Sequence, residues 1–289
     1  MKRIKKYILT IILIGLILIT TGCKQDNMED IKIIVTNYAK EYIASKIYSK
    51  HATITSIYPD GTDIRNYNIT KKQKQDFASY DLFIYNGLDE SERKLAVELL
   101  DINSNLRIID VAYVLETEYS VEELWLNPSS LLMMSNNLRM GLNEYLVSNY
   151  LKKEVNENYD NLKITLSEID ADYRVAVEEA NKKTILVANR SLKYLTKFGI
   201  NVLVLDEQTT EKELYDIKEL ASVDSINHIY KFKNDQVSEQ VQAFASEYGV
   251  SITDLSRIDN LTDAERDNNK NYIDLMQDNL DALKLEMYQ

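Results

Sequence analysis

The sequence contains few residues that form covalent or metal-linked crosslinks. Its 289 residues include one cysteine and two histidines, His51 and His228. A single cysteine excludes an intramolecular disulfide framework and a metal site made of several thiolates. The stability of the protein must therefore come from a packed core, and we expect both histidines to be ordinary surface or strand residues.

The sequence also lacks the short motifs of common enzyme classes. It has no glycine-rich phosphate loop, no Gly-x-Ser-x-Gly elbow and no His-Glu-x-x-His helix. The formal net charge is −12 at pH 7, from 46 acidic and 34 basic residues. This sign disfavours nucleic acid and anionic lipid as partners of the folded part. We therefore predict that the protein is not an enzyme.

The amino terminus has the three regions of a signal peptide. Residues 1–6 include four cations, residues 7–19 are uncharged, and Thr20-Thr21-Gly22 precedes the only cysteine, Cys23. The apolar run is shorter than the roughly 20 residues that span a membrane. We predict a signal peptide over residues 1–22, lipid attachment to Cys23 and a polar tether over residues 23–30.

These features place the folded part on the extracytoplasmic face of the cell membrane, anchored by lipid. Only seven glycines and two prolines occur, whereas lysine, isoleucine, asparagine and tyrosine are frequent. This composition favours a Gram-positive cell surface.

Beyond the tether, short β-rich runs alternate with helical patterns. Strands are predicted at residues 31–36, 52–57, 82–86, 106–111, 184–187, 201–205, 228–232 and 251–253. Helices are predicted at residues 38–49, 71–78, 89–100, 191–198, 211–221 and 238–248. The alternation predicts an α/β fold with an N-terminal lobe over residues 31–149 and a C-terminal lobe over residues 182–289, each with a mostly parallel sheet.

A long helix is predicted between the lobes. Residues 150–181 contain no glycine or proline, and apolar residues recur every three or four positions from Leu151 to Ala180. At 1.5 Å per residue this helix is about 48 Å long, enough to cross a two-lobed body. We interpret it as a rigid connector rather than a coiled-coil segment, and expect it to limit hinge motion.

Five short motifs carry a resemblance to a known family. They are the strand Ile33-Ile34-Val35-Thr36, the segment Tyr58-Pro59-Asp60-Gly61-Thr62-Asp63, the segment Tyr80-Asp81-Leu82-Phe83-Ile84-Tyr85-Asn86-Gly87-Leu88, the run Trp125-Leu126-Asn127-Pro128, and Lys193-Tyr194 leading to Phe198-Gly199. In this order and spacing they resemble the substrate-binding lipoproteins of ABC importers for metal ions, the zinc and manganese receptors. The resemblance covers essentially all of the sequence after the signal peptide.

The resemblance implies two Rossmann-like lobes joined by the long helix, with a metal site in the cleft between them. It also implies a lipid-anchored monomer that delivers a metal ion to an ABC permease in the membrane. The alternative is a degenerate paralogue that keeps the fold but binds no metal, and acts as an adhesion, interaction or accessory lipoprotein. Fold alone does not decide between these functions.

The family's four ligand positions carry unusual residues here. The resemblance places Arg65 at the first position and Glu123 at the second, both histidines in the family. It places Asn189 at the third position, a histidine or glutamate in the family, and Asp254 at the fourth. The predicted metal-ligating residues are therefore Glu123, Asn189 and Asp254, with the cation of Arg65 beside them.

Three arrangements of this cleft are open. In the first, the guanidinium of Arg65 lies between Glu123 and Asp254 and takes the place of the metal. In the second, Arg65 turns outward, and Glu123, Asn189 and Asp254 form an all-oxygen site that suits manganese, magnesium or calcium better than zinc. In the third, Arg65 binds a carboxylate or phosphate of an anionic or zwitterionic ligand.

Overall fold

The computed structural model describes residues 27–223 and 226–289. The predicted signal peptide and the predicted lipidation site, Cys23, lie outside the described residues. Within the described part of the chain, no helix is both long enough and apolar enough to cross a membrane.

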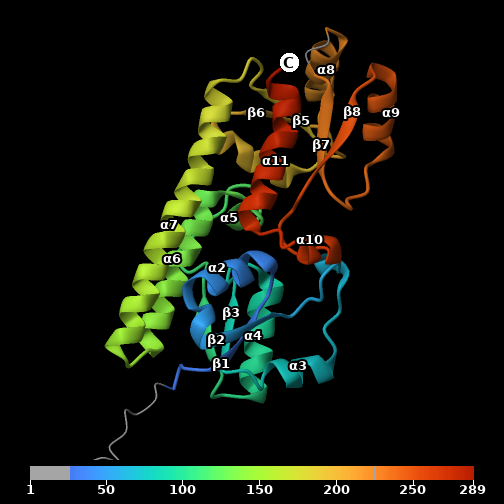
Figure 1. Ribbon diagram of the computed structural model, residues 1–289. Helices are drawn as coiled ribbons and strands as arrows, with labels where there is room; N and C mark the ends of the chain where they lie inside the picture. The colour runs from blue at the N-terminus through green and yellow to red at the C-terminus, as the bar shows by residue number, and fades with distance from the viewer. Residues whose placement is uncertain (1–26, 224–225) are drawn as a thin grey trace, which may run out of the picture.

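Two parallel sheets form two lobes, stacked one above the other in Figure 1. The N-terminal sheet has the order β2-β1-β3-β4 and contains β1 (Ile31–Val35), β2 (Ala52–Ser56), β3 (Leu82–Tyr85) and β4 (Arg107–Asp110). The C-terminal sheet has the order β6-β5-β7-β8 and contains β5 (Thr184–Val187), β6 (Asn201–Val204), β7 (His228–Phe232) and β8 (Ser251–Leu255). Every strand pair described is parallel. The predicted α/β fold with two parallel lobes is confirmed.

Helices cover both sheets. The α-helices are α2 (Tyr38–Tyr48), α3 (Lys71–Phe77), α4 (Glu90–Ile102), α5 (Glu123–Leu126), α6 (Pro128–Tyr145), α7 (Asn149–Glu178), α8 (Glu211–Ser222), α9 (Glu239–Tyr248), α10 (Asp263–Asp267) and α11 (Tyr272–Met287). The 3-10 helices are η1 (Ser49–His51), η2 (Ile64–Asn66) and η3 (Arg190–Phe198). The predicted α-helix over residues 191–198 is thus a 3-10 helix, and α11 was missing from the sequence prediction.

The long helix α7 runs beside both lobes (Figure 1). It has 30 residues, and it packs against α2 and α6 of the N-terminal lobe and against α11 of the C-terminal lobe. The apolar stripe read from the sequence supplies the buried face, from Leu151 through Leu162 to Tyr173 and Val177. Because these contacts fall on both lobes, α7 holds the two lobes together.

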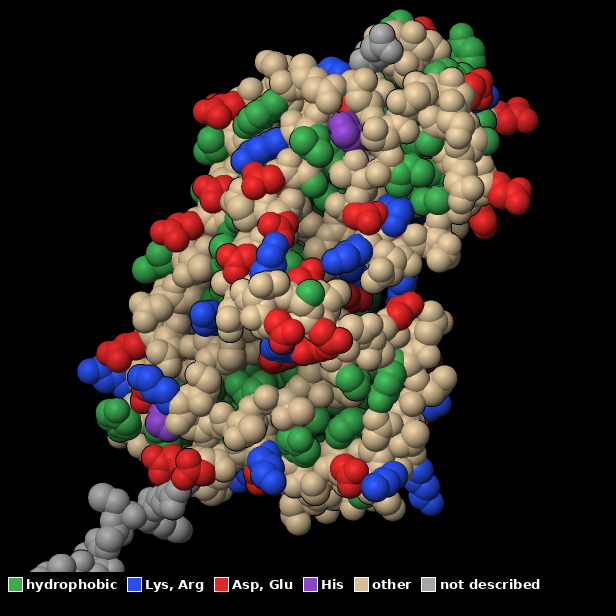
Figure 2. All heavy atoms as spheres, turned by 45° about the vertical axis from the view of Figure 1, so that its right-hand side comes forward, with side chains coloured by type: hydrophobic (Ala, Val, Ile, Leu, Met, Phe, Trp, Pro, Cys, Tyr) green, Lys and Arg blue, Asp and Glu red, His purple; other side chains and the backbone are tan. Residues whose placement is uncertain are grey.

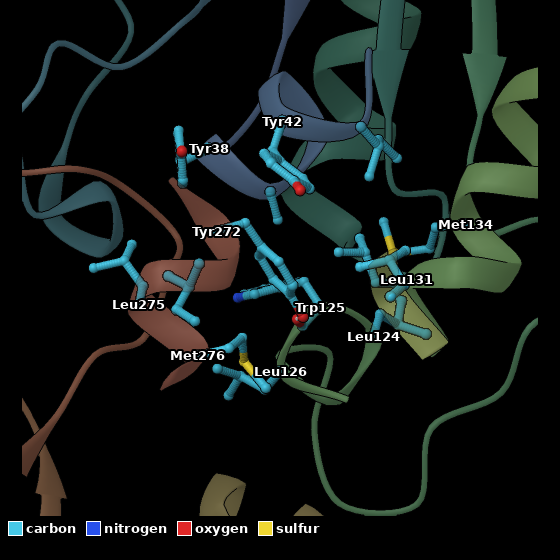
Figure 3. Packing of buried hydrophobic residues seen from close by; sticks show 14 of the residues in the cluster. Tyr38, Tyr42, Leu124, Trp125, Leu126, Leu131, Met134, Tyr272, Leu275 and Met276 are labelled. Carbon is cyan, nitrogen blue, oxygen red and sulfur yellow. The ribbon is translucent and has the colours of Figure 1, made fainter. Parts of the chain in front are cut away.

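The lobes also share a core where α2, α5 and α11 meet (Figure 3). The rings of Tyr42 and Tyr272 stack with their centroids 5.3 Å apart. The buried hydroxyl of Tyr272 donates to the carbonyl oxygen of Trp125 at 2.7 Å. A packed core that continues from one lobe to the other opposes a free hinge between them.

The loop after β2 is held to the C-terminal lobe by hydrogen bonds to main-chain oxygen atoms. The N–H of Gly61 donates to the carbonyl oxygen of Leu261 at 2.7 Å, and Nδ2 of Asn260 donates to the carbonyl oxygen of Pro59 at 2.8 Å. Gly61 has a φ of +73°, a left-handed conformation that favours glycine. This docking holds η2, and with it Arg65, at the junction of the lobes.

Candidate functional site

The junction between the lobes is lined by residues that follow the carboxyl ends of strands, where open α/β sheets bind their ligands. Asn189 follows β5, Asp235 follows β7 and Arg257 follows β8 in the C-terminal lobe, while Arg65 lies on η2 in the N-terminal lobe. Figure 2 shows acidic and basic side chains close together across the middle of the molecule.

Asp235 is the centre of a charge network at this junction. Its carboxylate accepts hydrogen bonds from Nη1 of Arg65 at 2.6 Å, from Nη2 of Arg257 at 2.8 Å and from Nδ2 of Asn189 at 2.9 Å. The Asp235 side chain is only 12% exposed, so these charge-assisted bonds form largely away from water. One carboxylate therefore joins two guanidinium groups, one from each lobe.

Arg257 extends the network back to the N-terminal lobe. Its side chain is 7% exposed, and its Nη1 donates to the carboxylate of Glu122 at 2.9 Å. The guanidinium carbon lies 4.0 Å from the centre of the Phe232 ring, a cation–π contact. Nε1 of Trp125 donates to the main-chain oxygen of Arg257 at 2.9 Å. Arg257 is thus held by charge, by an aromatic face and through its backbone.

Arg65 has different partners from those expected. Its guanidinium contacts Asp63 and Asp235, and does not lie between Glu123 and Asp254. The hydrogen bond from Arg65 is the main cause that lowers the pKa of Asp63. The hypothesis that Arg65 bridges Glu123 and Asp254 is therefore wrong, because Asp235 is the acceptor within its reach.

Glu123 lies in a separate cluster, on the first turn of α5. It is 1% exposed, and its carboxylate pairs with Nζ of Lys197 from η3 at 2.7 Å. The same carboxylate accepts from the main-chain N–H of Glu118 at 3.1 Å and of Tyr119 at 3.0 Å. In this position Glu123 ties the loop before α5 to the C-terminal lobe.

Asp254 lies inside β8 rather than after it. Its main chain is in register with Lys231 of β7, and its half-exposed carboxylate pairs with Nζ of that residue at 2.6 Å. Of the four residues assigned from the resemblance, the structure brings together Arg65 and Asn189, both on Asp235, and places Glu123 and Asp254 elsewhere.

Four charged residues of the junction were missing from the sequence prediction: Glu122, Asp235, Arg257 and Asp259. A usable signal was present for Asp235 and Arg257, since each comes two or three residues after a strand end in the same sheet. The prediction ended the last strand at residue 253, so it assigned the strand-end position to Asp254 instead.

The donor set at the junction does not suit zinc. The acidic side chains there are paired with arginine, and zinc prefers nitrogen and sulfur ligands. His51 pairs with Glu154 at 3.0 Å, and His228 contacts Thr253 at 2.8 Å at the amino end of β7, opposite Asp235. Among the described residues, no group of three or more His, Cys, Asp or Glu side chains is placed to share one metal ion.

Asp259 has an unusual proton affinity. Burial raises the pKa of its carboxyl to about 6, although the positive charge of Arg257 opposes the shift. The nearest arginine nitrogen, Nε of Arg257, is 3.9 Å away, too far for a strong hydrogen bond. The Asp259 carboxyl therefore binds its proton more tightly in the folded chain than in the unfolded chain. The protonated carboxyl stabilises the folded chain, and this contribution is lost as the pH rises through about 6.

We expect Asp259→Asn to raise the free energy of unfolding at pH 8 but not at pH 4, because asparagine carries no charge that must be buried. The gain is at most about 3 kcal/mol, at roughly 1.4 kcal/mol per pKa unit. Urea unfolding of both proteins between pH 4 and 8 measures it. Parallel pH profiles for the two proteins would show that Asp259 is not the titrating group.

The fold and the junction define a class, the two-lobed binding proteins with a long connecting helix. Within that class, the chain belongs to the family described as zinc-uptake complex component A, periplasmic (ZnuA), whose profile matches residues 33–285.

Curated relatives carry zinc-related names. The chain is 21% identical over 290 residues to the high-affinity zinc uptake system protein ZnuA of Bacillus subtilis, covering 92% of this chain and 90% of the relative. It is also 21% identical to the zinc-binding lipoprotein AdcA of Streptococcus pneumoniae, of which it spans 58%. The preference for manganese over zinc drawn from the sequence finds no support in these relatives.

Solved structures share the fold. The metal-dependent lipoprotein YcdH of Bacillus subtilis aligns with a TM-score of 0.74 at 20% identity, covering 90% of this chain and all (100%) of that one. The Zn(II)-bound ZnuA-like domain of Streptococcus pneumoniae AdcA aligns with a TM-score of 0.73, also at 20% identity, with the same coverage. At this level of identity the likeness concerns the fold.

Proposed function

We propose that the protein is the extracytoplasmic binding component of an ABC importer of the zinc-uptake class, anchored by lipid on Cys23, in which arginine side chains take the place of the metal ion. Family membership over residues 33–285 supports the importer role, with a membrane permease as partner. Such a binding component needs two lobes, a helix such as α7 that holds them together, and a cleft at the carboxyl ends of the strands.

The observation that carries the second part of the proposal is the chain of contacts Glu122–Arg257–Asp235–Arg65. Each carboxylate in it already faces a guanidinium, so a divalent ion would have to displace a permanent cation or sit beside one. At an effective dielectric constant near 20, repulsion between a divalent ion and a guanidinium a few ångströms away costs several kcal/mol. The network therefore disfavours zinc at the junction.

We expect the melting temperature of the purified protein, after treatment with a chelator, to stay unchanged on addition of zinc, manganese, calcium or magnesium. A metal that binds only the folded state at 100 times its dissociation constant would add about 2.7 kcal/mol of stability, which a thermal melt detects easily. Arg65→His, which removes the more exposed guanidinium and adds a nitrogen ligand, should gain a zinc-dependent shift.

A clear zinc-dependent rise in the unaltered protein, abolished in Asp235→Asn, would contradict the replacement of the metal by arginine. It would leave the importer role intact and assign zinc as the cargo.

The second candidate is an accessory or interaction lipoprotein that carries no cargo. It is favoured by the same network, because protein side chains alone satisfy the charges that join the lobes. Co-purification decides between the candidates, since an importer component should retain an ABC permease and its ATPase and an accessory protein should not.

A further inference from the structure

A cavity of about 470 Å³ lies between the junction and the carboxyl edge of the N-terminal sheet. Thr36 and Asn37, which follow β1, and Glu92 on the first turn of α4 line one part of it, while Arg257 and Asp259 line another. Its volume is that of a small-molecule site. Strands β1 and β3 are neighbours in the sheet. The chain goes from β1 to β2 on one side and from β3 to β4 on the other. Ligands of open α/β sheets bind where the strand order reverses in this way.

Asn37, which lines this cavity, has an unused hydrogen-bond donor. The residue is 1% exposed, and its Oδ1 accepts from the main-chain N–H of Lys40 at 3.0 Å as the cap of α2. This bond fixes the orientation of the amide, because only its oxygen can accept. Its buried Nδ2 has no partner within the described part of the chain. Leaving a buried donor unpaired is unfavourable, and an oxygen atom of a ligand would satisfy it.

The carboxylate of Glu92, which lines the same cavity, is bound to other donors. Its oxygens accept from the hydroxyl of Thr36, from Nζ of Lys40 at 3.0 Å and from the main-chain N–H of Asn86 at 2.6 Å. The buried Lys40–Glu92 pair is electrically neutral as well. At Asn37 this wall of the cavity therefore offers a donor.

Asp259, on the adjoining wall of the cavity, offers a hydrogen-bond acceptor. Glu98, Glu122 and Glu92 all line the cavity too, but each has a lysine or arginine partner within 3.0 Å. The Asp259 carboxylate accepts hydrogen bonds from the main-chain N–H groups of Asp259 and Asn260, but its paired cation, Arg257, approaches no closer than 3.9 Å.

The backbone segments that carry the unused donor and the weakly paired acceptor are hydrogen-bonded to each other. The main-chain N–H of Tyr38, the residue after Asn37, donates to the carbonyl oxygen of Asp259 at 2.9 Å. Rings and aliphatic side chains complete the lining, among them Ile57, Tyr58, Tyr67, Ile69 and Leu95.

We propose that this cavity binds an α-amino acid or a similarly small zwitterion, whose carboxylate accepts from Asn37 and whose ammonium group pairs with Asp259. The two charged groups of an α-amino acid are attached to one carbon atom, which matches an adjacent donor and acceptor. Its side chain would pack against Tyr58, Tyr67 and Leu95. This binding goes beyond the proposed function, since it requires neither a metal nor an importer.

Isothermal titration calorimetry of the purified protein with each of the twenty standard L-amino acids, in the presence of a chelator, tests the proposal. At least one of them should bind and raise the melting temperature. The same compound with its carboxylate converted to an amide should bind at least tenfold more weakly. Because metal is removed, failure here bears on the cavity alone and leaves the zinc experiment unaffected.

Two variants locate the site. Asn37→Asp keeps an oxygen to cap α2 but replaces the donor by an acceptor, so it should bind at least tenfold more weakly, and its melting curve shows whether it is folded. Asp259→Asn should also lose at least tenfold in affinity, whereas Asp216→Asn, at an exposed position on α8, should lose none. If no amino acid binds, or if Asn37→Asp binds with unchanged affinity, the proposal is overturned.

Discussion

Replacing Arg257 by methionine is expected to lower the free energy of unfolding by about 4 kcal/mol, the range seen when one partner of a buried ion pair is removed. Methionine keeps much of the side-chain volume over Phe232 but leaves Glu122 without its cation. The Arg257 side chain is 7% exposed and that of Glu122 is 18% exposed, so water replaces little of the lost interaction. Urea unfolding monitored by circular dichroism measures the change.

Arg65→Met is the matched control, because Arg65 bonds the same carboxylate of Asp235 with a side chain that is 43% exposed. Exposed ion pairs contribute at most about 1 kcal/mol, so this variant should unfold close to the unaltered protein. Equal losses in the two variants would contradict the view that Arg257 is the structural member of the network and Arg65 the peripheral one.

The second large effect is expected at Glu123. Glu123→Ala should lower the free energy of unfolding by about 3–5 kcal/mol, since it leaves Lys197 without its carboxylate and two main-chain N–H groups without an acceptor. Thermal and urea unfolding in the presence of a chelator measure it without any contribution from metal.

Glu123→Gln separates the two causes. Glutamine keeps an oxygen for the N–H groups of Glu118 and Tyr119 but loses the charge that faces Lys197, so it should retain part of the stability. If Glu123→Ala instead left the chelated protein as stable as before and removed a zinc-dependent shift, Glu123 would be a metal ligand, as the resemblance implies.

Local patterns in the sequence were enough to predict most of the architecture. The apolar stripe between Leu151 and Val177 identifies α7, because a helix can bury such a stripe only along one face. Short β-branched runs separated by amphipathic segments predict parallel strands with helical crossovers, and the sheets have that form. The helix α11 was missed although Asn271 caps it and its buried residues recur at helical spacing.

The candidate site was harder to predict, because its residues come from separate strand ends. A side chain reaches the junction only if its strand stops at the right residue, and strand ends are the least certain part of a sequence-based prediction. Strand β8 continues to Leu255, which keeps Asp254 in the ladder beside Lys231 and carries Arg257 to the junction instead.

The sequence by itself therefore determined the class of fold, the long helix and the family. Only the tertiary structure decided which carboxylate faces Arg65. Asp235 lies 170 residues away along the chain, and no local pattern specifies a contact over that separation. The packing of the two lobes along α7 brings the two side chains together.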